Sequence, residues 1–256
     1  MKIHWVQHVP FESIGRIADW AQARNHELVP VRAFAGQDVP APGGCDALVV
    51  MGGPMSAGDR GRPRWLASEI AAVRAVAAHG IPVLGVCLGA QVLAAAHGAT
   101  VLRAPQREIG WFPVAVRAPV SWSGGVAAAD DVPRTGTRVL ARALADALPV
   151  EFTPLHWHGD TYIRPNGAIV VASSAACKNQ IVVFGPRAAG LQFHLEMAAD
   201  GVAALVENCG DEIDGGPWAR PVGEILAGAE SHLHACHQIL DSLLDAFFDP
   251  SLNNPA

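Results

Sequence analysis

The first hundred residues alternate between short apolar runs and longer stretches in which apolar positions recur at helical spacing. Runs such as "DALVVM" are apolar throughout, which is typical of strands covered on both faces of a sheet. The stretches between the runs carry apolar residues on one face and predict amphipathic helices. We expect strands at residues 2–9, 27–34, 46–51 and 81–87, and helices at residues 11–26, 64–80 and 88–98.

This alternation of strand and helix predicts a parallel sheet with helices on both of its faces. Two of the helical stretches end at a glycine, Gly80 and Gly98, which is the residue that most often closes a helix. Pro30 has no N–H to donate to a neighbouring strand, so residues 27–34 are expected to form an edge of the sheet.

The second half of the chain has a different rhythm. Short β-like runs follow one another with few helices between them, which indicates antiparallel hairpins added to one side of the parallel sheet. The Gly-, Pro- and Asp-rich stretch 118–136 is expected to be a loop, and the chain is expected to be helical from residue 198 onward. The fold class is therefore α/β, with residues 1–200 as the core domain and residues 201–256 as a helical extension of it. The β-like runs are residues 108–116, 168–174, 180–185 and 189–194, and the longest helical pattern is 224–248.

Composition excludes several classes of protein. Half of the 256 residues are hydrophobic and the net charge is −6 without any basic run, so neither disorder nor nucleic-acid binding is expected. The five cysteines form an odd set without a C-x-x-C pair, which favours free thiols in a reducing compartment. The amino terminus lacks the long apolar region of a signal peptide, and no apolar stretch reaches bilayer length. A cytoplasmic protein without a membrane partner is expected.

The segment "GVCLGAQ" places a cysteine between two glycines where an apolar strand gives way to a helix. A strand–turn–helix with small residues around a nucleophile is the nucleophile-elbow pattern, and its tight turn explains Gly85 and Gly89. Cys87 would then lie at the carboxyl end of a central strand and at a helix N-terminus, an environment that lowers a thiol pKa. Free cysteines are usually small buried hydrophobes, however, and the glycines alone do not decide between the two interpretations.

The segment "LQFHLE" supplies the base that a thiolate nucleophile needs. His194 and Glu196 are two residues apart, so on an extended segment they project to the same side. The carboxylate can accept the Nδ1–H of the imidazole, which fixes the tautomer that leaves Nε2 facing a thiol. An H-x-E pair is weak evidence by itself, and its weight comes from the elbow upstream.

Acyl chemistry also needs donors for a developing oxyanion, and the loop "GGPMS" at residues 52–56 can provide one. Its two glycines leave their backbone N–H groups unobstructed, and Pro54 stiffens the turn. The strands that end at Met51 and Cys87 are plausible neighbours. The N–H groups of Gly53 and Leu88 could then receive the oxyanion together, although an ordinary turn after a strand would have the same sequence.

Taken together and in this order, "GGPMS", "GVCLGAQ", "HWHGD" and "LQFHLE" resemble the class I (triad) glutamine amidotransferase family. The resemblance covers roughly residues 40 to 200. It is closest to stand-alone members that look like the glutaminase domain of GMP synthase. It implies an open, flavodoxin-like sheet and a hydrolase that needs no cofactor and no metal. It also implies Cys87 as the nucleophile, His194 as the general acid and base, and Glu196 as its orienting partner.

The resemblance further implies Gly53 and Leu88 as the oxyanion donors and Gln91 as a contact to the glutamine substrate. "HWHGD" matches a loop whose backbone borders the amino-acid end of the substrate, so Trp157 and His158 are candidate binding residues; a packed aromatic and a surface histidine are the alternative. The family pattern has a proline after the catalytic histidine, where this chain has Leu195. A proline would rigidify the H-x-E turn, so its absence leaves the geometry of the pair open.

Three functions remain open on the sequence alone. The chain could be a glutaminase that supplies ammonia to a separate synthetase, since it lacks the G-K-[ST] loop of an ATP-binding domain. It could be a free-standing hydrolase of γ-glutamyl amides or peptides, because the same triad cleaves any γ-glutamyl amide that fits. It could also be a non-catalytic binding protein on the same fold, which the intact Cys, His and Glu set disfavours.

A further cluster, "SHLHACHQ", brings His232, His234, Cys236 and His237 close together in the sequence. On a helix His234 and His237 share a face, whereas His234 and Cys236 do not. Imidazoles on a solvated helix usually form part of a polar surface, so no metal site is predicted here.

Overall fold

The computed structural model describes residues 1–58, 62–117 and 131–253 of the chain. Its strands are β1 Lys2–Gln7, β2 Glu27–Arg32, β3 Ala47–Val50, β4 Val83–Val86, β5 Val101–Trp111, β6 Val114–Val116, β7 Glu151–Phe152, β8 Leu155–Tyr162, β9 Ile169–Ser173, β10 Ile181–Gly185 and β11 Ala188–Leu191. Its helices are α1 Ile17–Ala23, α2 Arg64–Ala78, α3 Leu88–Ala96, α4 Thr135–Ala147, α5 Ala199–Cys209 and α6 Val222–Phe247. Short 3-10 turns lie at η1 Ala33–Ala35, η3 Gly210–Glu212 and η4 Pro250–Asn253.

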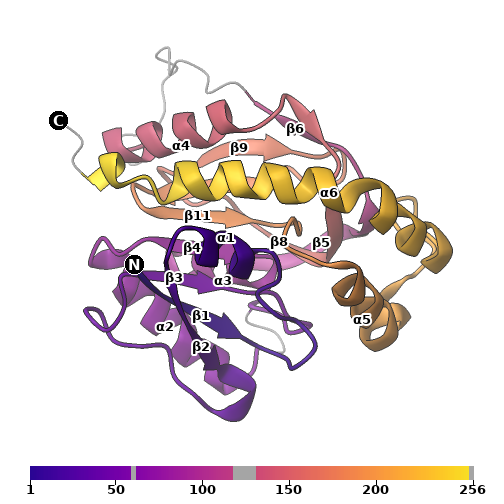
Figure 1. The fold of residues 1–256 in the computed structure, drawn as a ribbon, viewed down its shortest axis with the longest axis horizontal. Helices are drawn as coiled ribbons and strands as arrows, with labels where there is room; N and C mark the ends of the chain where they lie inside the picture. Colours follow the sequence, from indigo (N-terminus) through magenta and orange to yellow (C-terminus); the bar gives the residue numbers. More distant parts are fainter. Residues whose placement is uncertain (59–61, 118–130, 254–256) are drawn as a thin grey trace.

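A nine-stranded sheet of order β2-β1-β3-β4-β11-β10-β9-β6-β7 runs through the molecule (Figure 1). β2, β1, β3, β4 and β11 are parallel to one another, and each strand from β10 onward pairs antiparallel with its neighbours. The predicted mainly parallel sheet with antiparallel strands on one side is confirmed, and β2, which contains Pro30, is an edge strand. β5 and β8 pair with each other in a separate antiparallel ribbon.

Side chains of the central strands alternate between two apolar layers, as the period of a strand requires. In β3, Ala47 and Val49 belong to one core cluster, and Leu48 and Val50 belong to the other. Helices α2 and α3 pack in the cluster of Leu48 and Val50, whereas α1, α4 and α6 pack in the opposite one (Figure 1). The sheet is therefore covered on both faces, as the alternating pattern predicts.

The predicted helix at residues 11–26 is wrong over its first part, because α1 begins only at Ile17. Gly15 has a φ of +54°, in the left-handed region that ends a regular helix, and a Cβ there would collide with the main-chain oxygen of Glu196. The segment before it is a turn that runs beside the H-x-E segment, and the N–H of Arg16 donates to the Glu196 carbonyl at 2.8 Å. This turn carries Glu12 into the interior.

Two further elements differ from the sequence prediction. Helix α4 was not expected, although its buried Leu140, Ala141 and Leu144 recur at helical spacing. The "HWHGD" motif, matched to a loop, lies within strand β8. Of the predicted loop 118–136, residues 118–130 lie outside the described part of the chain, and Thr135 and Gly136 begin α4.

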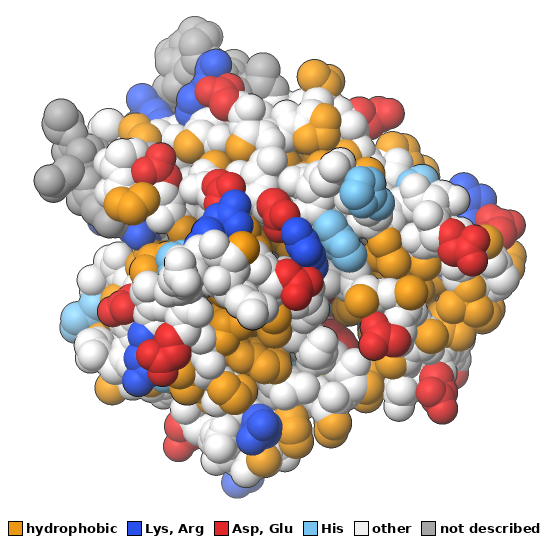
Figure 2. All heavy atoms as spheres, in the orientation of Figure 1, with side chains coloured by type: hydrophobic (Ala, Val, Ile, Leu, Met, Phe, Trp, Pro, Cys, Tyr) orange, Lys and Arg blue, Asp and Glu red, His pale blue; other side chains and the backbone are white. Residues whose placement is uncertain are grey.

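Helix α6, with 26 residues, packs along the sheet and belongs to the same core cluster as β4 and β11. Figure 2 shows red and blue side chains side by side where α1 meets α6, and there Arg16 pairs with Asp241 at 2.7 Å and Arg24 pairs with Asp245. We infer that residues 201–256 extend the core domain. No helix among the described residues is long and apolar enough to cross a membrane.

If α6 completes the core, truncating its buried face should destabilise the whole chain. Leu243 is fully buried, so Leu243→Ala should lower the free energy of unfolding by about 2–5 kcal/mol. Leu226 lies on the same helix but is 41% exposed, and Leu226→Ala should change it by less than about 0.5 kcal/mol. Urea unfolding followed by circular dichroism measures both variants. Equal effects would contradict a core role for α6.

Candidate active site

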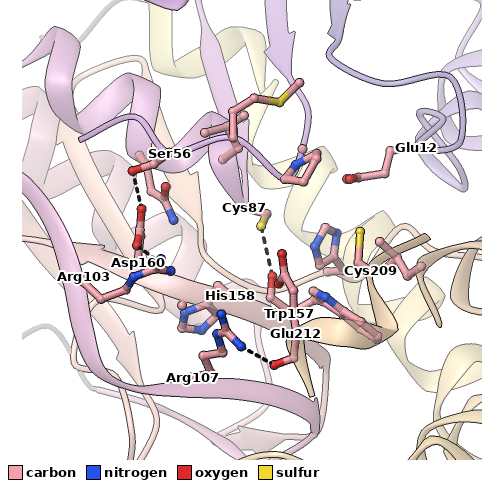
Figure 3. Close-up of a pocket in the computed structure, with 18 residues that line it drawn as sticks. Glu12, Ser56, Cys87, Arg103, Arg107, Trp157, His158, Asp160, Cys209 and Glu212 are labelled. Atoms are coloured by element: carbon pink, nitrogen blue, oxygen red, sulfur yellow. Dashed lines mark hydrogen bonds and ion pairs between the residues drawn. The ribbon is translucent and has the colours of Figure 1, made fainter. Parts of the chain in front are cut away.

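A cavity of about 160 Å³ opens where β3 and β4 reach their carboxyl ends (Figure 3). This is the edge at which open α/β sheets place ligands. Its walls come from the turn after β1, the loop 52–56, the first turn of α3, the β5–β8 ribbon and the end of α5. Seven of the eight site residues expected from the sequence line this cavity. The eighth, Glu196, lies behind His194 and is hydrogen-bonded to it.

Cys87 is held in a strained conformation between β4 and α3. Its φ of +52° and ψ of −108° are uncommon for a residue with a side chain and cost about 1–3 kcal/mol. A Cβ at Gly89 would collide with the main-chain oxygen of Val50, and one at Gly85 would collide with that of Gly89. The two glycines thus allow α3 to approach β3 and β4 closely, and the elbow geometry expected from "GVCLG" is present.

His194 and Glu196 form a buried pair. The Nδ1 of His194 donates to Oε1 of Glu196 at 2.6 Å, and both side chains are almost fully buried. The second carboxylate oxygen accepts the backbone N–H of Leu195 at 3.0 Å. Proline has no N–H, so the leucine at this position supplies a hydrogen bond that the usual family residue could not. These two hydrogen bonds define the geometry of the His194–Glu196 pair, which the sequence left open.

Cys87 and His194 face the same cavity and interact with each other. The thiol also donates a hydrogen bond to the carbonyl oxygen of Trp157, at a distance of 3.6 Å (Figure 3). Nδ1 of His194 is committed to Glu196, so the ring nitrogen left for the thiol is Nε2. The structure brings together the three residues expected to form a triad.

Burial is the largest influence on the pKa of the Cys87 thiol and raises it, although His194 opposes the shift. The expectation of a lowered thiol pKa is therefore wrong, because the sequence does not reveal how deeply the sulfur is buried or that Glu12 and Glu196 lie nearby. Burial alone would lower the pKa of His194, but the Glu196 carboxylate and the Cys87 sulfur outweigh it and raise that pKa well above its ordinary value.

The other expected residues surround this pair. A Cβ at Gly53 would lie 3.1 Å from Cδ2 of Leu88, so the side chain of Leu88 packs against the loop that contains Gly53, and both residues line the cavity. Gln91 is buried on the first turns of α3 and lines the cavity, with its Nε2 3.4 Å from Oε1 of Gln192. Trp157 borders the thiol through its carbonyl group.

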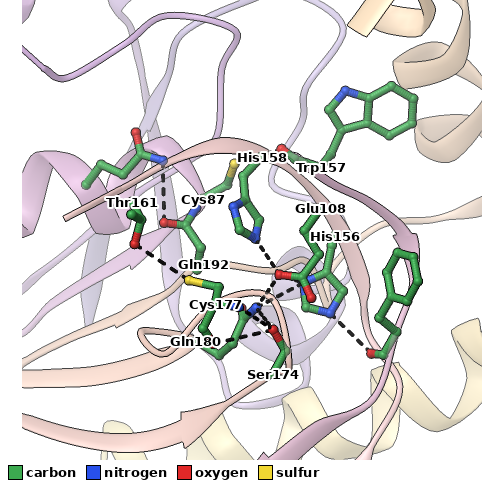
Figure 4. Close-up of polar contacts among 12 residues, drawn as sticks. Cys87, Glu108, His156, Trp157, His158, Thr161, Ser174, Cys177, Gln180 and Gln192 are labelled. Atoms are coloured by element: carbon green, nitrogen blue, oxygen red, sulfur yellow. Dashed lines mark hydrogen bonds and ion pairs between the residues drawn. The ribbon is translucent and has the colours of Figure 1, made fainter. Parts of the chain in front are cut away.

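His158 lines the cavity, and its imidazole is hydrogen-bonded to Glu108 (Figure 4). Its Nε2 donates to Oε2 of Glu108 at 3.1 Å, and Nε2 of Gln180 donates to the same oxygen at 2.7 Å. Burial alone would raise the pKa of Glu108, but the hydrogen bond from His158 and the nearby His156 lower it. This network fixes the β5–β8 ribbon against the cavity.

Glu108, His156 and His158 are the group within the described residues whose atoms are spaced closely enough to hold a metal ion. Their carboxylate oxygen already accepts two N–H groups, which accounts for the cluster as a hydrogen-bond network. The histidines near the carboxyl terminus do not converge. His232 packs on Trp111, and Nε2 of His237 lies 2.8 Å from the carbonyl oxygen of Met197.

Several charged residues of the cavity were not found from the sequence. Glu12 falls within the predicted helix 11–26, and its position in the cavity depends on the turn that follows β1. Arg103 and Arg107 come from β5, and Glu212 comes from turn η3. None of them belongs to a motif, so only Asp160, the last residue of "HWHGD", carried a sequence signal.

Comparison with known proteins gives a consistent result. The family model for glutamine amidotransferase class-I matches residues 21–209. The chain is 30% identical over 241 residues to the glutamine amidotransferase-like protein YfeJ of Salmonella typhimurium, covering 89% of this chain and 90% of that protein. It is also 30% identical over 218 residues to the glutamine-hydrolyzing GMP synthase of Leifsonia xyli, covering 82% of this chain but only 37% of the synthase.

Solved structures of glutamine amidotransferases are also similar to this chain. A glutamine amidotransferase of Thermotoga maritima superposes with a TM-score of 0.79 and 26% identity, covering 97% of this chain and 98% of that one. A glutamine amidotransferase of Methylobacillus flagellatus superposes with a TM-score of 0.81 and 25% identity, covering 96% and 93% of the two chains. The family model and the relative that matches over most of both chains show that the chain belongs to the class I glutamine amidotransferase family.

Proposed function

We propose that this protein hydrolyses the side-chain amide of glutamine, or of a related γ-glutamyl compound, through a thioester on Cys87. The observation that carries the proposal is the meeting of a strained, buried cysteine with a Glu-oriented imidazole in one cavity. Membership of the class I glutamine amidotransferase family supports amide hydrolysis in general. It leaves the residues, the mechanism and the substrate to be tested.

In the first half of the reaction the thiol proton passes to Nε2 of His194 as the sulfur attacks the side-chain amide carbon. The backbone N–H groups of Gly53 and Leu88 receive the oxyanion that forms. The carbon–nitrogen bond then breaks, and the proton held by His194 passes to the leaving nitrogen. Ammonia is released from glutamine, and a γ-glutamyl thioester remains on Cys87.

In the second half a water molecule takes the place of the departed nitrogen. His194 removes a proton from this water as its oxygen attacks the thioester carbon, and the proton then returns to the sulfur. Glutamate leaves and the thiol is restored. Glu196 acts throughout by holding Nδ1 of the ring and by stabilising the imidazolium, which explains why both of its oxygens have donors.

The destination of the ammonia distinguishes two forms of this function. Similarity to part of a glutamine-hydrolyzing GMP synthase supports a separate ammonia-accepting synthetase as partner. Similarity to YfeJ over nearly its whole length supports a chain that acts by itself, and hydrolysis of γ-glutamyl peptides is the second candidate activity. Ammonia release from glutamine by the isolated protein favours independent action. Release only when a synthetase is added favours the subunit role.

The nucleophile can be identified directly with a glutamine analogue that carries an electrophile at the side-chain carbon. Mass spectrometry should place the adduct on Cys87, and Cys87→Ala should lower kcat for glutamine by about 10⁴-fold or more. Cys45 is buried outside the cavity, so Cys45→Ala should keep full activity and labelling. Glutaminase activity that survives Cys87→Ala in the absence of wild-type protein would refute the assignment.

The pH behaviour of His194 tests its pairing with Glu196. Because its pKa is raised, the imidazole should lose its proton only at a pH above about 6.5, and the neutral ring that forms there is the base that takes the thiol proton; nuclear magnetic resonance of labelled histidine measures this titration. In Glu196→Gln the burial effect prevails, so the pKa should fall, and kcat should drop about 10³- to 10⁴-fold.

Folding stability gives an independent check of the same pair. Because the folded-state pKa of His194 is raised, its contribution to stability is complete below the unfolded pKa of about 6.5 and is lost as the pH rises through the folded value. The stability advantage of the wild type over Glu196→Gln should therefore shrink as the pH increases. An advantage that grows with pH would contradict the pairing.

A further inference from the structure

The cavity has two chemically different sides (Figure 3). Ser56, Asp160 and Arg103 lie on one side of Cys87, and Ser56 donates to the Asp160 carboxylate at 2.6 Å. Glu12 and Cys209 lie on the other side. The first side contains paired charges and hydroxyl groups. The second side contains carboxyl groups and apolar surface.

Glu12 is the most unusual group on the second side. Its side chain lines the cavity, yet the residue is only 5% exposed. Its carboxylate oxygens are not among the fully buried polar atoms without a partner, so they reach the cavity, and burial of the residue raises the pKa of the carboxyl group. A ligand N–H or a cation that enters the cavity finds an acceptor there.

The position of Glu12 relative to His194 indicates which part of a substrate it meets. A Cβ placed on Gly52 would collide with Oε2 of Glu12 and would lie 3.2 Å from Cε1 of His194. Oε2 of Glu12 and Cε1 of His194 therefore both lie close to the same point beside Gly52. The charge of His194 is also the main influence that opposes the raised pKa of Glu12. The imidazole edge next to Nε2 and the Glu12 carboxylate are neighbours.

The leaving nitrogen of a γ-glutamyl amide must lie within reach of His194, because that residue protonates it. The amino-acid end of the substrate is expected on the opposite side, toward Gln91, His158 and Asp160. The nitrogen and whatever it carries then point toward Glu12. A carboxylate oxygen there accepts one N–H of the leaving amide, and it meets a negatively charged leaving group with repulsion.

A second carboxyl group strengthens this repulsion. Glu212 lines the same cavity, and its charge raises the pKa of both Glu12 and Cys209. Burial raises the pKa of the Glu212 carboxyl, and Arg107 and Arg103 oppose this shift. The guanidinium of Arg107 donates to the main-chain carbonyl of Glu212 at 2.6 Å, whereas that of Arg103 lies 3.5 Å from the carboxylate of Asp160, on the first side of the cavity.

We propose that Glu12 and Glu212 form a subsite for the leaving group of the substrate. This subsite accepts ammonia and amines whose substituent carries no charge, and it rejects leaving groups that carry a carboxylate. The proposal rests on the γ-glutamyl amidase function and narrows its substrate class. Glutamine and γ-glutamyl alkylamides are substrates of this site, and γ-glutamyl peptides are poor ones, because an amino-acid leaving group places its carboxylate beside Glu12.

Two substrates of similar size separate charge from bulk. γ-Glutamylethylamide and γ-glutamylglycine both release glutamate, so one coupled glutamate assay measures kcat/KM for each. The wild type should prefer the ethylamide by at least tenfold. In Glu12→Gln that preference should shrink at least fivefold, mainly through better use of γ-glutamylglycine. Glu207→Gln removes a charge from an exposed position of α5 and should leave the preference unchanged.

The outcomes are distinct. Equal use of both substrates by the wild type, or a uniform loss of activity in Glu12→Gln with the preference intact, would overturn the subsite. If Glu12→Gln does not fold, Glu212→Gln on turn η3 should reduce the preference in the same direction, and an unchanged ratio there would also overturn it. Failure of the wild type to release glutamate from glutamine or from either amide would overturn the amidase function itself.

Discussion

The close approach of α3 to the ends of β3 and β4 is the constraint on which the site depends. At Gly85 and Gly89 the neighbouring main-chain atoms occupy the space that a Cβ would need. All nine residues of α3 are buried, so packing of this helix offsets the backbone strain of about 1–3 kcal/mol at Cys87. A thiol anchored to a core helix has little freedom to turn away from the cavity.

Sheet order brings the second half of the triad to this thiol. β11 is parallel to β4, with Leu191 paired to Val86, and the N–H of Cys87 donates to the Leu191 carbonyl at 2.7 Å. Because parallel strands end at the same edge, the residues that follow each strand become neighbours. His194 follows β11 as Cys87 follows β4. The antiparallel strands beyond β11 therefore extend the sheet without disturbing the site.

The strands and the positions of Cys87, His194 and Glu196 could be predicted because each depends on a local pattern. The glycines around Cys87 and the spacing of His194 and Glu196 both constrain the backbone within a few residues. Glu12 could not be predicted, since apolar periodicity extended a helix across Gly15, whose positive φ reflects contact with the distant Glu196 segment. The pKa of Cys87 was predicted in the wrong direction for a similar reason, because burial depends on packing by the whole chain.

The raised pKa of Cys87 has a consequence for how the site is activated. Burial raises the pKa of the Cys87 thiol most, and the charges of Glu12 and Glu196 add to this shift while His194 opposes it, so the balance favours the protonated thiol over the thiolate. In the proposed reaction, an amide N–H that reaches the Glu12 carboxylate would decrease the negative potential at the sulfur and make proton transfer to His194 easier. Under that proposal, a carboxylate on the leaving-group side links the presence of an acceptable substrate to formation of the nucleophile, without any movement of the backbone.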